Sequence, residues 1–168
     1  RPAPASAMCI RIPLLLVLAL AFSTAPPATA QQPEPGPTPA VLPMQERAEV
    51  INTWLAERFE SVLPALMRRE DTDMWIVSAR EYNEDPVIET MLPATWMAAR
   101  RRTMLVFYDR GPDEGIERLA ISRYDVGELF PSAWDPDEQP NQWARLSDIV
   151  PERDPETIAV NTSETFAL

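Results

Sequence analysis

The amino-acid sequence predicts an α/β domain, because helix-like and strand-like segments alternate along it. Residues 46–69 place apolar side chains three and four positions apart, which is the spacing of one helical face. Four short apolar runs have the length and composition of β-strands, at residues 73–79, 103–109, 117–124 and 157–161. Polar or proline-containing loops separate these runs, so we expect a single folded domain.

The long segment 46–69 is expected to form the main helix of the domain. Its apolar stripe includes Trp54 and Phe59, and both side chains are predicted to lie in the core. Proline lacks the N–H group that a helix interior needs, and its ring crowds the preceding turn. Pro64 therefore predicts either a kink or a division into two short helices.

The first strand, residues 73–79, leads into a polar loop that runs from Arg80 to Pro86. In α/β proteins the loops at the carboxyl ends of strands are common places for ligands and partners to bind. Turn-forming glycine and proline residues separate the strands at 103–109 and 117–124, which predicts that these two strands form a hairpin.

Two shorter helical segments are also expected. Residues 84–95 are predicted to contain one or two helical turns that end near Pro93. Residues 142–150 have the spacing of a short helix, with four side chains directed inward: Trp143, Leu146, Ile149 and Val150.

The amino-terminal part of the chain has the composition of an export signal. Arg11 precedes the apolar run 14–22, and the small residues 28–30 resemble a cleavage site, so residues 1–30 are predicted to be upstream residues and a secretory signal peptide. An uncleaved membrane anchor is the alternative. Residues 31–44 are rich in proline and predict an extended linker. The folded domain is then expected at 45–168, in a periplasmic or secreted protein.

The composition excludes several classes of function. All fifteen basic residues are arginine, and 26 acidic residues give a formal net charge of −11, which disfavours binding to nucleic acid or to an anionic membrane. The chain has no histidine, so catalysis by a Ser-His or Cys-His pair is excluded. The single cysteine, Cys9, lies in the predicted leader, so no disulfide is expected in the folded part.

Two groups of charged residues are candidates for chemistry. Four carboxylates follow the first strand and could together hold a divalent cation: Glu81, Glu84, Asp85 and Glu89. The alternative, which we favour, is a solvated acidic loop with local ion pairs. The basic run 100–102 is expected to pair with this acidic loop or with a neighbouring domain.

Residues 54–168 resemble the N-terminal domain of creatinase/aminopeptidase P-like proteins, and more narrowly that of exported bacterial Xaa-Pro aminopeptidase-like proteins of the pita-bread metallopeptidase superfamily. The resemblance rests on the order of seven stretches: MRREDTDMWIV (67–77), AREYNEDP (79–86), LPATWMAARRR (92–102), LVFYDRG (105–111), ISRYDV (121–126), LFPSAWDP (129–136) and NTSETFAL (161–168).

The resemblance implies a mixed sheet flanked by helices, as in the creatinase N-terminal domain. It also implies that catalysis belongs to a following pita-bread domain, where two Asp, one His and two Glu hold a divalent metal pair of Mn or Zn. No catalytic or metal-binding residue of this chain is assigned. The chain stops within an expected helix at Thr165, so we expect the domain to be incomplete at its carboxyl terminus.

In the proteins that this chain resembles, the N-terminal domain contributes to oligomerisation and to control of access to the active site. The resemblance therefore implies that Arg80, Tyr82 and Asn83 contact substrate or a neighbouring subunit. It implies that the protein forms a homo-oligomer. The expected partners of this domain are the protein's own pita-bread domain and, in the full-length protein, a peptide substrate. Two alternatives stay open, namely an acidic periplasmic interaction module and the N-terminal domain of a relative that is not a peptidase.

Overall fold

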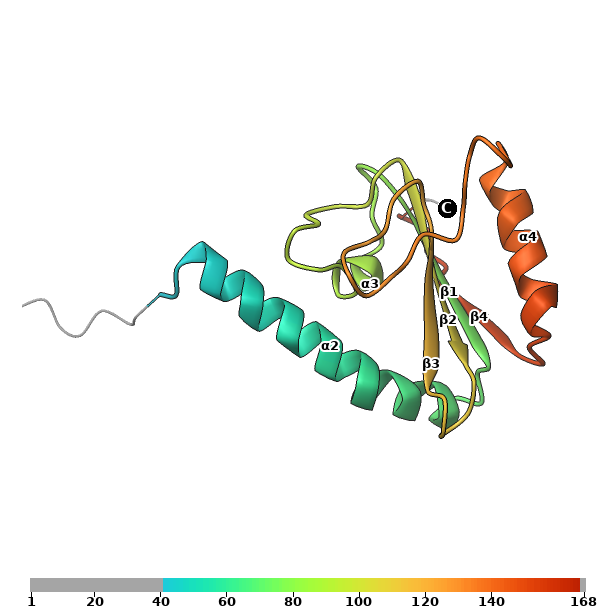
Figure 1. Cartoon of the computed structure of the whole chain (residues 1–168), viewed down its shortest axis with the longest axis horizontal. Helices are drawn as coiled ribbons and strands as arrows, with labels where there is room; N and C mark the ends of the chain where they lie inside the picture. The colour runs from blue at the N-terminus through green and yellow to red at the C-terminus, as the bar shows by residue number, and fades with distance from the viewer. Residues whose placement is uncertain (1–40, 167–168) are drawn as a thin grey trace, which may run out of the picture. The chain divides into compact units, whose positions relative to one another are not determined.

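The computed structural model describes residues 41–166, which form one layered α/β unit (Figure 1). The elements, in chain order, are α2 (Met44–Arg69), β1 (Met74–Arg80), α3 (Pro86–Glu89), β2 (Arg102–Asp109), β3 (Ile116–Ile121), α4 (Gln142–Arg153) and β4 (Ile158–Val160). The predicted signal peptide and most of the predicted linker lie outside the described residues. Within the described part of the chain, no helix has the length and apolar character needed to cross a bilayer.

The four strands form one mixed sheet in the order β3-β2-β1-β4. Strand β2 is antiparallel to both β1 and β3, whereas β4 is parallel to β1. The predicted α/β class and the β2–β3 hairpin are therefore confirmed. Because β2 is antiparallel to both neighbours, β1 and β3 run in the same direction, and the loops that follow them leave the same end of the sheet.

Helix α2 covers one face of the sheet through four buried residues at a spacing of four: Leu55, Phe59, Leu63 and Met67. The ring of Phe59 packs against Phe107 of β2 and against Phe130, with ring centroids 5.7 and 5.3 Å apart. The helix runs without a break through Pro64, so the predicted division into two short helices is wrong. Burial of Leu63 and Met67, on either side of the proline, offsets the lost hydrogen bond.

The prediction that Trp54 lies in the core is also wrong, because its side chain is 63% exposed. In Figure 1 the amino-terminal half of α2 extends beyond the sheet, and Trp54 belongs to this half. The helical period places Trp54 next to the buried Leu55, about 100° away around the axis. Sequence periodicity locates an apolar stripe but does not show where the surface beneath it ends.

Helix α4 covers the opposite face of the sheet (Figure 1). Ile149 is fully buried against Met104, Val106 and neighbouring apolar residues, and Leu146 and Val150 pack at the margin of this second cluster, as predicted. The inward orientation predicted for Trp143 is wrong, because this side chain is 41% exposed.

Polar contacts hold the start of α4 in place. The Asn141 side chain accepts hydrogen bonds from the backbone N–H groups of Trp143 and Ala144, which caps the helix. Gln142 Nε2 donates to the backbone carbonyls of Arg102 and Ile121, at 3.0 and 2.6 Å. These two carbonyls lie at the start of β2 and the end of β3, so Gln142 ties α4 to one end of the sheet.

An ion pair joins the carboxyl-terminal ends of α2 and β2, at the end of β2 that lies away from Gln142. Arg68 donates from Nε and Nη2 to the two carboxylate oxygens of Asp109, at 2.7 and 2.8 Å. Hydrogen bonding from Arg68 lowers the pKa of Asp109 below its ordinary value of 3.8, and partial burial opposes this effect. The lowered pKa makes the stabilisation by Asp109 dependent on pH.

We expect the Asp109→Asn variant to be less stable than the parent chain at neutral pH and to approach it in acid. A lowered folded-state pKa stabilises the protein above the unfolded-state pKa, and this contribution disappears as the pH falls through the folded-state pKa. Urea unfolding of both proteins over a pH series that extends below 3.8 measures the difference. Asp113→Asn, at an exposed position in the next turn, serves as control. A difference that is constant with pH would contradict the assignment.

Candidate functional site

A groove of about 1130 Å³ lies at the end of the sheet where β1 and β3 finish and β2 begins. Arg80 ends β1, Arg102 begins β2, and Arg123 follows β3, so three strands each bring one arginine to this end. The segment 95–101 between α3 and β2 forms another wall. The groove therefore combines basic side chains from three separate parts of the chain, at residues 80, 100–102 and 123.

The structure places two of the three predicted site residues in this groove. Arg80 and Tyr82 line it, whereas Asn83 does not. The N–H of Asn83 donates to the carbonyl of Arg80 at 3.0 Å and closes a tight turn. Asn83 therefore helps to shape the loop, and its half-buried side chain is not part of the groove lining.

Tyr82 is held outward by its own loop. Its φ angle is 66°, in the left-handed region that a residue with a Cβ atom seldom adopts, and its side chain is 92% exposed. The backbone N–H of Tyr82 donates to Glu84 Oε1 at 3.2 Å. A large aromatic side chain in a constrained loop that faces solvent is typical of a contact residue.

The loop after β1 is fixed to the segment before β2 by two hydrogen bonds. The N–H of Glu81 donates to the carbonyl of Arg101 at 2.6 Å, and the N–H of Arg101 donates to Glu81 Oε2 at 2.8 Å. Arg101 has a φ angle of 54°, so it shares the left-handed conformation of Tyr82. Two strained residues thus lie on adjoining loops that are joined to each other.

The arginines at 100–102 do not interact with the acidic loop in the predicted way. The contact to that loop is made by the backbone of Arg101, not by a guanidinium group. The guanidinium of Arg100 lies over the ring of Trp96, 5.9 Å from its centroid, and that of Arg102 lies over Trp143 at 5.1 Å. Aromatic rings hold these cations because π faces attract them while leaving the N–H edges accessible.

The acidic residues after β1 are separated by their local contacts. Asp85 caps α3 by accepting the N–H of Val87 at 2.8 Å, and its second oxygen accepts from Asn161 Nδ2 at 3.1 Å. Glu81 binds the N–H of Arg101, while Glu84 binds that of Tyr82. Among the residues that the structure describes, no three Asp, Glu, His or Cys side chains converge as metal ligands would.

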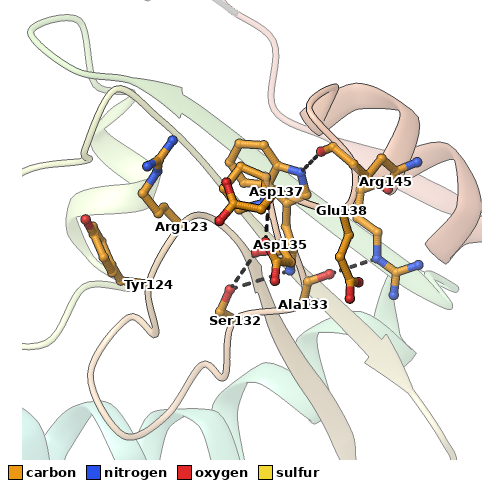
Figure 2. A pocket seen from close by; sticks show the side chains of 11 residues that line it. Arg123, Tyr124, Ser132, Ala133, Asp135, Asp137, Glu138 and Arg145 are labelled. Atoms are coloured by element: carbon orange, nitrogen blue, oxygen red, sulfur yellow. Dashed lines mark hydrogen bonds between the residues drawn. The ribbon is translucent and has the colours of Figure 1, made fainter.

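A second groove of about 890 Å³ adjoins the first and shares Arg123, Tyr124 and Trp134 with it. Figure 2 shows Arg123 and Tyr124 on one side of this groove and Asp135 and Asp137 across from them. Trp134 is fixed at the junction, because its indole N–H donates to the carbonyl of Gln139 at 2.7 Å. The second groove therefore has acidic and basic side chains in similar numbers, whereas the first is mainly basic.

Sequence reasoning missed Arg123 and Tyr124 as members of the site. They come directly after β3, much as Arg80 ends β1 and Tyr82 follows it, and β1 and β3 are parallel to each other because each is antiparallel to β2. That relation could have placed both arginine–tyrosine pairs at one end of the sheet. No sequence pattern indicated that Trp96 belongs to the site.

Comparison of the chain with family models, with curated proteins and with solved structures finds no match.

Proposed function

We propose that this chain is the non-catalytic N-terminal domain of an exported, metal-dependent Xaa-Pro aminopeptidase-like protein, with a fold like that of the creatinase N-terminal domain. Its role is assembly of the oligomer and control of access to an active site in a following domain. The mixed sheet with helices on both faces is compatible with this assignment. The divalent metal pair of the catalytic domain supplies Lewis-acid catalysis and activates water.

The observation that carries the proposal is the outward display of Tyr82 beside Arg80. Tyr82 is 92% exposed although its loop is fixed by hydrogen bonds at both Glu81 and Asn83. Exposing a large aromatic ring in a rigid loop favours a contact that another subunit or domain completes. Arg80, at the end of β1, provides the adjoining positive charge. This pair is suited to contact a catalytic domain or the peptide that enters it.

The coding sequence beyond the codon for Leu168 gives the first test. An in-frame continuation with the two Asp, one His and two Glu of the superfamily supports the proposal. A continuation that lacks these ligands indicates a relative that is not a peptidase. A nearby stop codon indicates a separate acidic interaction module, which is the runner-up function.

The second test is functional and uses the protein with that continuation. We expect Arg80→Ala combined with Tyr82→Ala to change the oligomer size, or to lower kcat/KM for an Xaa-Pro peptide by roughly tenfold, since contact residues at interfaces typically contribute at that level. Light scattering and peptidase kinetics measure the two effects. Arg47→Ala, an exposed arginine on α2, is the control. Unchanged oligomer size and unchanged kinetics would remove this loop from both roles.

A further inference from the structure

The arginine-rich groove reverses the charge of the chain around it. Five of the fifteen arginines line it: Arg80, Arg100, Arg101, Arg102 and Arg123. Glu81 is the single carboxylate in the lining. The eight ion pairs found within residues 41–166 involve none of these five guanidinium groups. An excess of four positive charges thus persists in one groove of a protein whose net charge is −11.

Such a concentration of like charge attracts anions. Arginines that stand close together repel one another, and each unpaired guanidinium keeps its N–H donors available. Six of the eight arginines elsewhere in the described chain form ion pairs, as Arg118 does with Glu60 at 2.9 Å and Arg153 with Glu117 at 2.6 Å. The groove therefore differs from the rest of the surface in the way that an anion-binding site would.

Aromatic side chains give the groove a second chemical character. The guanidinium of Arg100 lies over Trp96, which also lines the groove, and that of Arg102 lies over Trp143. Tyr82 and Tyr124 line the same groove and are largely exposed. Flat apolar surfaces between fixed cations suit a ligand that carries both carboxylates and hydrocarbon.

The backbone at the groove provides independent support. Tyr82 and Arg101 both have positive φ angles, 66° and 54°, and the Glu81–Arg101 hydrogen bonds hold their loops together. Conformations of this kind cost free energy for residues other than glycine, and they concentrate at ligand-binding segments. Both residues with positive φ angles belong to segments that line the groove.

We propose that this groove binds an acidic peptide segment. Carboxylates of the segment bind the guanidinium groups of Arg100, Arg102 and Arg123, and its apolar parts lie against Trp96 and Tyr124. Cations distributed over several segments suit a chain of carboxylates better than one small anion, which would contact only two or three of them. The acidic surface elsewhere disfavours a long phosphate backbone. The inference does not depend on the proposed peptidase.

The test measures binding of fluorescein-labelled hexaglutamate to the full 168-residue chain by fluorescence anisotropy. We expect saturable binding that weakens with added salt, and at least about tenfold weaker binding by the Arg100→Ala/Arg102→Ala variant. Arg47→Ala/Arg69→Ala removes the same charge from α2, outside the groove, and should retain more of the affinity. Arg123→Ala, at an exposed position, should weaken binding without disturbing the fold as measured by circular dichroism.

Three results would overturn the proposal. The first is absence of saturable hexaglutamate binding, and the second is an equal loss of affinity in the groove variant and in the α2 control. The third is tighter binding of a labelled oligothymidylate with the same number of charges, which would indicate a nucleic-acid site. None of these results alters the proposed peptidase relationship, because the coding sequence and the oligomer size test that separately.

Discussion

The Phe59→Ala variant is expected to lose about 3–5 kcal/mol of unfolding free energy, the usual cost of removing a buried aromatic ring. Phe59 is 1% exposed and contacts the rings of both Phe107 and Phe130. Those two rings also contact each other, with centroids 5.6 Å apart, so the cavity cannot close without disturbing a second pair. Denaturant unfolding, followed by circular dichroism, measures the change.

The same helix offers a matched control for this prediction. Trp54→Ala removes a larger aromatic side chain from α2, but Trp54 is 63% exposed and should cost less than about 0.5 kcal/mol. Equal losses in the two variants would mean that the amino-terminal half of α2 is covered in solution. Such a result would contradict the burial pattern of this helix.

The second large effect is expected on the opposite face of the sheet. Ile149→Ala should lower the unfolding free energy by about 2–5 kcal/mol, since Ile149 is the fully buried residue of α4. It packs against Met74, Met104 and Ile121, which belong to three different strands. The loss of this contact should also loosen the hydrogen bonds that Gln142 makes to the sheet, and hydrogen exchange at β2 and β3 would detect that change.

Trp143→Ala is the control for this second prediction. The ring is 41% exposed and stacks on Arg102, so its removal should cost about 0.5–1 kcal/mol through the cation–π contact. A loss as large as that of Ile149→Ala would show that Trp143 is a core residue. The two variants therefore test whether Ile149, and not Trp143, is the core residue of α4.

Sequence patterns predicted the elements of this fold well because each pattern is local. The four strands lie within a few residues of their predicted bounds, and a predicted short helix at 142–150 extends to Arg153. The third strand ends at Ile121 and not at Tyr124, and the chain turns there, with the Ser122 hydroxyl donating to the Tyr124 carbonyl. Of the predicted helical turns at 84–95, only Pro86–Glu89 forms a helix, with Asp85 as its cap.

The candidate site was less predictable, because it is assembled from distant segments. The loop after β1 was evident from its polarity, and Arg80 and Tyr82 do line the groove. The opposite wall comes from residues 122–124, more than forty positions later in the chain, and a lone Arg–Tyr pair carries little signal. The contact between the Arg100 guanidinium and the Trp96 ring was not predicted. Ion pairs were expected for the basic run, but the partners of these arginines depend on which side chains the fold brings near them.

Periodicity and turn chemistry in the sequence were sufficient for the α/β class, the β2–β3 hairpin and core positions such as Phe59 and Ile149, because these follow from backbone geometry over a few residues. The strand order, the exposed positions of Trp54 and Trp143, and the meeting of five arginines in one groove required the tertiary structure. A helix has the same repeat along its whole length, but the surface that it covers has an end. Which charges become neighbours depends likewise on how the strands are ordered in the sheet.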